Sequence, residues 1–170
     1  QIFRNIINEN FDGDRLSKLN QLYDDYADRL RSAPASSFEH FHNAIPGGYC
    51  DHILRVITFS KYQYKMWKMV GCYVDNFTEN ELIFSALNHD LGKLGLPGDD
   101  LDLYRKNKSE WHVKNQGKLY ESNPNLPNIT ISDNTMYILQ KYQLSCTLNE
   151  YLAIKIHDGV YDDANKPYYM

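Results

Sequence analysis

The chain has 170 residues, of which 42% are apolar, 24% charged and 14% aromatic. This composition is typical of one globular domain with a substantial core. The formal net charge of −4 at pH 7 argues against long nucleic acid as a partner, because sequence-independent binding of nucleic acid requires a basic surface. A small phosphorylated ligand stays compatible with that charge, since a few local cations or a metal ion suffice to bind it.

The cysteine content and the hydropathy pattern bear on the cellular compartment. The three cysteines, Cys50, Cys72 and Cys146, are odd in number and form no CxxC motif, which favours reduced thiols over a disulfide framework. No apolar run approaches the roughly 18 residues that a membrane span requires, and no signal peptide is visible. We therefore expect a cytoplasmic protein without a membrane partner.

The first half of the chain is predicted to be helical with one irregular interruption. Apolar residues recur with helical spacing over residues 15–31, and this helix is expected to end before Pro34. Residues 36–48 are expected to be irregular, because they finish in a Pro-Gly-Gly sequence that a helix interior does not tolerate cheaply. A long helix is predicted over residues 49–70.

The second half contains two clear helix starts. Thr78 with Glu81, and Thr147 with Glu150, have the spacing of capping boxes. The predicted elements are a helix from Thr78 onward, a loop over 94–102, a helix over 110–121, a loop over 123–132, a helix from Ser132 or Asp133 to Lys141, and a helix from Thr147 to Asp158. Because no repeat or linker interrupts this pattern, we predict a single all-α domain over residues 1–170.

Three predicted helices carry imidazole or carboxylate groups on or beside their apolar faces. His52 precedes an apolar face, the adjacent His89 and Asp90 end one, and His157 with Asp158 follows a third. An ionised carboxylate buried without a partner would cost several kcal/mol. A divalent cation would offset this charge and accept neutral imidazole nitrogens. The alternative for each histidine is a core or helix-end position with an ordinary hydrogen-bond partner.

Three sequence stretches resemble the successive motifs of the HD-domain metal-dependent phosphohydrolases. They are GGYCDHILRV, NHDLGK and LNEYLAIKIHDG, and the resemblance extends over about residues 40–159. The longer stretch HNAIPGGYCDHILRV is similar to the entry motif of a branch with exoribonuclease-like and nucleotide-hydrolysing members. The resemblance implies an HD-type helical bundle with a metal site at its centre.

The resemblance also implies a set of metal ligands. It makes His52, His89 and Asp90 ligands, and it places a fourth ligand on a late helix, where Asp158 and His157 are the two alternatives. The implied cofactor is one or two ions of Mn, Fe, Co, Ni, Zn or Mg. Asp90 would then either position the attacking water in a one-metal site or bridge two metals.

Further residues are expected to act on the substrate. Lys93 belongs to the motif and is expected to contact a phosphate, and His112 is expected to contact a second metal or the substrate. The remaining candidates for substrate binding are Arg55, Lys114 and His42. For each of these residues, an ordinary solvated position on a helix or loop is the alternative.

The function implied by the resemblance is hydrolysis of a phosphoester or phosphoanhydride in a nucleotide or similar small phosphorylated substrate. One alternative is a 3′-5′ exonuclease or cyclic-nucleotide phosphodiesterase. The other is a catalytically inactive nucleotide-binding HD module. The sequence leaves open whether the chain forms a homo-oligomer.

Overall fold

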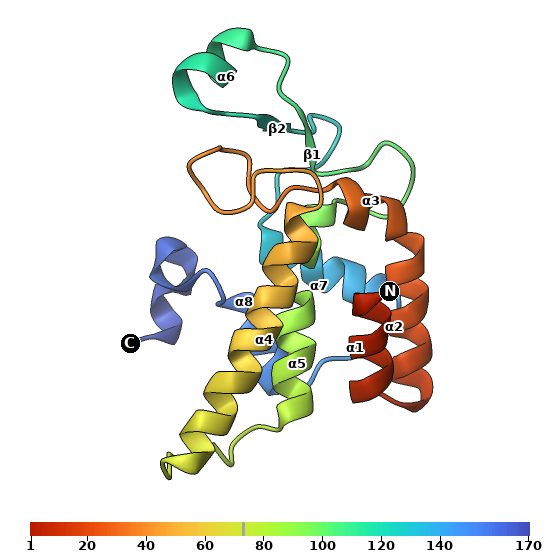
Figure 1. Ribbon diagram of the computed structural model, residues 1–170, viewed down its shortest axis with the longest axis vertical. Coiled ribbons are helices and arrows are strands. Elements are labelled where there is room, and N and C mark those ends of the chain that lie inside the picture. Colours follow the sequence, from red (N-terminus) through yellow and green to blue (C-terminus); the bar gives the residue numbers. More distant parts are fainter. Residues whose placement is uncertain (73) are drawn as a thin grey trace.

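The computed structural model describes residues 1–72 and 74–170 of the chain. The fold is all-α, with a single small hairpin in the part described (Figure 1). The elements in chain order are α1 (Ile2–Asn10), α2 (Gly13–Asp25), α3 (Ala27–Ser32), α4 (Gly48–Met69), α5 (Glu79–Asn88), the 3₁₀ helix η1 (Leu91–Leu94), β1 (Tyr104–Lys106), α6 (Glu110–Gln116), β2 (Tyr120–Ser122), α7 (Ile131–Lys141), α8 (Leu148–Lys155), and the 3₁₀ helices η2 (Gly159–Tyr161) and η3 (Asp163–Tyr168).

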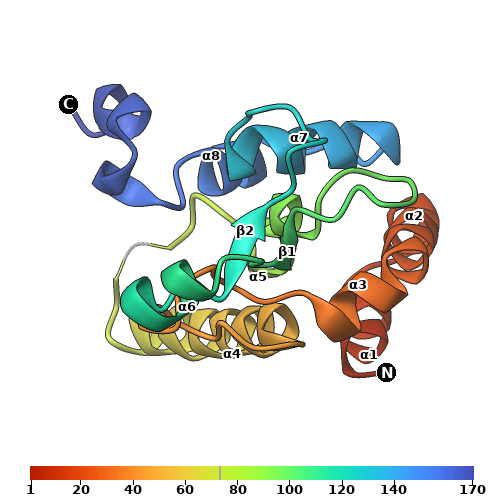
Figure 2. The same cartoon turned by 90° about the horizontal axis from the view of Figure 1, so that it is seen from above.

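Helix α5 lies at the centre of the molecule. Figure 2 shows it between α4 on one side and α7 with α8 on the other. Its last six residues, 83–88, are all buried, because α4 and α8 pack against the helix. The predicted capping box is present, with Thr78 Oγ1 accepting from the Glu81 amide and the Glu81 carboxylate accepting from the Thr78 amide. The cap therefore fixes where the central helix begins.

Gly92 lets the segment that follows α5 pack directly against α7. A Cβ atom at this position would lie 2.3 Å from the Ile131 carbonyl oxygen, which is closer than atoms can approach. The Gly92 amide donates to Thr135 Oγ1 over 2.8 Å, and the Asn134 side-chain amide donates to the Gly92 carbonyl over 2.8 Å. These contacts hold the backbone directly after Asp90 in a fixed position.

Arg15 connects α2, α5 and α8 through one side chain. Its guanidinium donates to both oxygens of the fully buried Glu150 carboxylate over 2.8 and 2.6 Å, and its carbon atom Cζ lies 4.0 Å above the ring of Phe84. Glu150 also accepts from the Thr147 amide in the second predicted capping box. This ion pair thus holds the start of α8 against the core.

Several predictions about the elements are confirmed and others are wrong. Helix α4 and both capping boxes match the predictions. The predicted helix over 15–31 is instead divided at Tyr26, whose buried hydroxyl donates to the Gly95 carbonyl over 3.1 Å. Helix α7 begins earlier than predicted, capped by Thr130. Helix α1 and the 3₁₀ helices after α8 were not predicted from the sequence.

Two predicted helices end early. The helix predicted over 110–121 ends at Gln116, because Gly117 takes the left-handed conformation with φ of 62° and the chain then returns as β2, antiparallel to β1. The helix predicted to reach Asp158 ends at Lys155, since Ile156 leaves the helical region with φ of −109° and ψ of 14°. None of the described helices is both long and apolar enough to cross a membrane.

We expect Arg15→Ala to lower the free energy of unfolding by about 3–5 kcal/mol, because it leaves the buried Glu150 carboxylate unpaired. Arg31→Ala is the matched control, since it removes a pair with Asp28 in which both side chains are exposed, and such pairs contribute at most about 1 kcal/mol. Urea denaturation of the two variants measures the difference. Equal losses of stability would contradict the structural role given to Arg15.

Candidate metal centre

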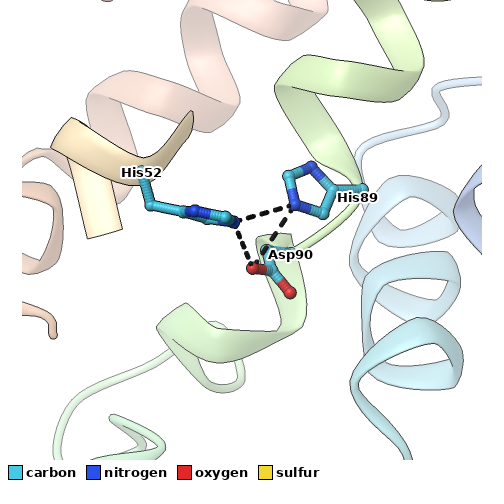
Figure 3. Close-up of side chains that lie close together, drawn as sticks. All are labelled: His52, His89 and Asp90. Carbon is cyan, nitrogen blue, oxygen red and sulfur yellow. Dashed lines mark hydrogen bonds and ion pairs between the residues drawn. The ribbon is translucent and has the colours of Figure 1, made fainter. Parts of the chain in front are cut away.

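Three helical segments deliver imidazole groups to one carboxylate. His52 is in the N-terminal part of α4, His89 is the C-cap of α5 with Asp90 next to it, and His157 follows the end of α8. Figure 3 shows the His52 ring reaching from α4 toward Asp90, with His89 on the same side of that carboxylate. The buried end of the central helix is therefore the point where the three segments meet.

The nitrogen atoms Nε2 of these rings surround the two oxygens of Asp90. His52 Nε2 lies 3.2 Å and His89 Nε2 3.4 Å from Asp90 Oδ2, and the two nitrogens are 3.2 Å apart (Figure 3). His157 Nε2 lies 3.3 Å from the other oxygen, Oδ1. Lys93 Nζ donates to Oδ2 over 2.8 Å. Each carboxylate oxygen thus has its own set of nitrogen neighbours.

Asp90 is charged despite its burial. Only 2% of its side chain is exposed, and this burial by itself would raise its pKa. The nearby imidazoles of His157, His52 and His89, together with the positive charge of Lys93, outweigh burial and hold the pKa of Asp90 well below its ordinary range. Oδ1 nevertheless has no partner with hydrogen-bond geometry among the described residues. The centre therefore contains an anion with one oxygen incompletely satisfied.

Backbone carbonyl groups fix which ring nitrogen carries the proton in His89 and His157. His89 Nδ1 lies 2.9 Å from the Ala86 carbonyl oxygen, and His157 Nδ1 lies 2.8 Å from the Ile154 carbonyl oxygen. A carbonyl oxygen can only accept, so Nδ1 carries the proton in both rings and the Nε2 atom of each neutral ring presents a lone pair. Those lone pairs face carboxylate oxygens, a repulsive arrangement unless a positive charge lies between them. Either protons on Nε2 or a metal ion would supply it.

The donor set has the composition and spacing of a metal-ion site. The ligand atoms of His52, His89 and Asp90 all lie within 4.8 Å of one another. In a tetrahedral site with metal–ligand bonds of about 2.0–2.1 Å, ligand atoms lie roughly 3.3–3.4 Å apart, close to the 3.2–3.4 Å separations found here. The carbonyl bond to His89 Nδ1 is also the outer contact that orients a metal-binding imidazole. This group of side chains could hold a metal ion.

The centre forms part of the wall of an open cavity of about 410 Å³. The residues lining it are His42, His52, Val56, Ser60, Leu82, Ser85, Ala86, His89, Asp90, Lys93, Ala153, His157 and Asp158. The His42 ring packs against the His52 ring in a tilted arrangement, with ring centroids 4.5 Å apart. Burial, followed by proximity to His52 and Lys93, lowers the pKa of His42. This ring is therefore neutral at neutral pH beside the centre.

The structure places the two alternatives for the late ligand differently. His157 is partly buried and its Nε2 faces Asp90, whereas the Asp158 side chain is 56% exposed and its one ionic contact among the described residues is His157, over 3.5 Å. The reason is the early end of α8, which lets the His157 ring turn back onto the Ile154 carbonyl. His157 thus belongs to the centre, and Asp158 lies at the rim of the cavity.

Three other predicted site residues lie apart from the cavity. Arg55 is exposed and pairs with Asp51 over 2.9 Å, and Lys114 is exposed near Glu110 at 3.9 Å. His112 is exposed on α6, next to Trp111, and α6 lies at the far end of the hairpin (Figure 1). None of the three is among the described residues that line the cavity. Of the predicted substrate contacts, Lys93 and His42 do line it.

The sequence analysis missed several residues of the cavity wall. Ser85 and Ala153 lie four residues before His89 and His157, and Val56 and Ser60 lie one and two turns after His52. Residues four apart share a helix face. Helical spacing from His52 and His89 would therefore have found Val56, Ser60 and Ser85, whereas His157 lies beyond the end of α8 and helical spacing does not relate it to Ala153.

Comparison of the chain with models of protein families, with curated proteins and with solved structures gave no match in any of the three. The candidate centre is thus defined by the geometry of this chain's own residues.

We expect the stability of the metal-free protein to depend on pH through this centre. The pKa of His157 is raised above its ordinary 6.5, because interactions with Asp90 and the Ile154 carbonyl outweigh burial, which alone would lower it. Its stabilising contribution is therefore complete below pH 6.5 and is lost as pH rises through the raised value. Asp90, with its lowered pKa, contributes above its ordinary value of 3.8 and loses this contribution on acidification.

Asp90→Asn removes the carboxylate charge on which both pH effects depend. Urea denaturation in EDTA between pH 5 and 8.5 should show a loss of stability toward high pH in the wild type and a flatter profile in the variant. Imidazole signals followed by NMR should show a lower pKa for His157 in Asp90→Asn, since the variant loses the charge of Asp90, which helps to raise that pKa against the effect of burial. A His157 pKa that is the same in both proteins would contradict this account of the centre.

Proposed function

We propose that the protein is an HD-type metal-dependent phosphohydrolase that acts on a nucleotide or a similar small phosphoester. The observation that carries this proposal is the convergence of three Nε2 atoms on the buried Asp90 carboxylate, in the wall of an open cavity. The HD-type bundle is part of the proposal, and the sequence motifs that suggest it coincide with the segments that form the centre.

The residues of the centre divide into a metal-holding group and a substrate-facing group. His52, His89 and Asp90 would hold the ion, and His157 stands on the opposite side of the Asp90 carboxylate. A divalent ion supplies Lewis acidity, which activates water and offsets the negative charge of a phosphoryl group. Lys93 lines the cavity and carries the nearest ammonium group to Asp90, so it can bind a phosphoryl oxygen as a point charge.

His157 is suited to proton transfer. Its Nδ1 proton is fixed on the Ile154 carbonyl, and its Nε2 atom faces both the cavity and Asp90 Oδ1. In hydrolysis the oxygen of water bonds to phosphorus, the phosphorus–oxygen bond to the leaving group breaks, and one proton passes from the water to the leaving oxygen. His157 can accept that proton at Nε2 and return it.

The cavity favours a small substrate over a long one. Its volume of about 410 Å³ falls within the range of roughly 300–1,000 Å³ that is usual for small-molecule sites. Lys93 is the one lysine or arginine among the described residues lining it. A single phosphorylated group is therefore the anion that this wall is best equipped to bind.

We expect His52→Ala, His89→Ala and Asp90→Asn each to reduce the content of bound metal, as measured by elemental analysis after reconstitution with Mn, Fe, Co, Ni, Zn or Mg. Removing one ligand of three should lower metal affinity by about 100-fold or more, because even residues outside the ligand set typically account for 10–100-fold. His40→Ala is the matched control, since this exposed imidazole does not line the cavity. Metal that remains at wild-type levels in all three variants would refute the centre.

We expect the reconstituted protein to release phosphate or a nucleoside from a panel of phosphomonoesters and nucleotides. Activity should disappear with excess EDTA and fall below about pH 6, because protonated imidazoles no longer bind metal. Short oligonucleotides and cyclic nucleotides in the same panel test the exonuclease and phosphodiesterase alternatives. Metal-loaded protein that binds nucleotides but hydrolyses nothing would instead establish an inactive binding module.

A further inference from the structure

A second cavity adjoins the candidate metal centre between α5 and α8. Its volume is about 250 Å³. It is lined by Phe77, Glu81, Leu82, Ser85, Asn149, Leu152 and Ala153. The function proposed above assigns it no role.

The two cavities share one wall. Leu82, Ser85 and Ala153 line both of them. Ser85 lies one turn before His89 on α5, and Ala153 lies four residues before His157 near the end of α8. Because the side chains of Ser85 and Ala153 are small, space remains between α5 and α8 where the apolar cavity adjoins the centre. A ligand at Asp90 can therefore extend along this wall.

The polar side chains of the second cavity are already engaged. The Glu81 carboxylate accepts from Thr78, Thr147 and Asn149, and the Asn149 side-chain amide also donates to the Asn76 carbonyl. The Ser85 hydroxyl donates to the Glu81 carbonyl over 2.8 Å. What the cavity offers a ligand is therefore mainly the apolar surface of Phe77, Leu82 and Leu152.

The aromatic wall of this cavity is supported from behind. The Phe77 ring packs on the buried Tyr64 of α4, with ring centroids 5.6 Å apart. A fixed aromatic ring favours another flat ring through offset or edge contacts. For size, a dry cavity of roughly 150 Å³ holds benzene, so this one has room for a single or a fused ring.

We propose that this cavity is a specificity subsite for the leaving group of the substrate. The substrate class is then phosphoesters whose alcohol carries a flat aromatic group, bound by shape and apolar contact without recognition of hydrogen-bonding edges. The aromatic group lies along Phe77 and Leu152 while the phosphoryl group lies at Asp90 and Lys93. This inference rests on the proposed function, because it assigns the phosphoryl group to the metal centre.

The kinetic test compares benzyl phosphate with methyl phosphate on the metal-loaded protein, because their two alcohol leaving groups have similar basicity. We expect kcat/KM to favour benzyl phosphate by about tenfold or more, since burial of a ring is worth at least that factor. Ala153→Phe fills the subsite and should abolish the preference for the aromatic ester over the methyl ester. Leu148→Phe is the matched control, because Leu148 is exposed on the same helix and does not line either cavity.

A binding test separates this inference from the proposed function. Phenol titrated into metal-free protein should shift the NMR signal of the Ala153 methyl group, and Ala153→Ser should retain binding that Ala153→Phe loses. Hydrolysis of both esters at similar rates, with no effect of phenol on Ala153, would overturn the subsite and leave the phosphohydrolase standing. Binding of phenol without hydrolysis of any ester would overturn the proposed function and the subsite's role with it.

Discussion

The burial of one carboxylate is the constraint on which the rest of the centre depends. Asp90 is almost fully excluded from solvent at the point where α4, α5 and the end of α8 meet. An anion in such a place requires positive charge close by. Lys93 supplies part of it, but two imidazoles present Nε2 atoms whose lone pairs face the carboxylate in their neutral form. The site therefore requires a cation between these groups, either protons on the Nε2 atoms or a metal ion.

Packing and polar contacts around the centre fix the positions of its charged groups. The capped central helix ends at His89, and Gly92 fixes the following turn against α7 by allowing a close approach that a Cβ would prevent. The ion pair of Arg15 with Glu150 holds α8 from its opposite end. Preorganised ligands lose little freedom when they bind a metal or substrate. The polar centre thus owes its geometry to contacts that lie outside it.

The cavity wall beside the centre is formed by residues close in sequence to its imidazoles. Ser85 and Ala153 stand four residues before His89 and His157, so the small side chains open space beside the nitrogen atoms. Phe77 and Leu152 continue this wall as the apolar surface of the second cavity. Together these residues place an apolar surface directly beside the charged groups of the centre.

The sequence by itself determined the features that depend on local spacing. The apolar pattern and the capping boxes predicted α4 and the starts of α5 and α8, and helical periodicity placed His89 and Asp90 at the buried end of a face. The resemblance of the sequence motifs to the HD-domain phosphohydrolases implied His52, His89 and Asp90 as a metal-binding set, and the structure brings these three side chains together. The predictions from local spacing succeeded because a helix fixes the direction of each side chain relative to its neighbours three and four residues away.

Only the tertiary structure decided what happens where a helix stops or a distant segment pairs. The departure of Ile156 from helical geometry turned His157 rather than Asp158 toward Asp90. Pairing of β1 with β2 shortened α6 and placed His112 away from the cavity. The rotation of a side chain beyond a helix end depends on contacts with residues remote in the chain, and periodicity carries no information about these contacts.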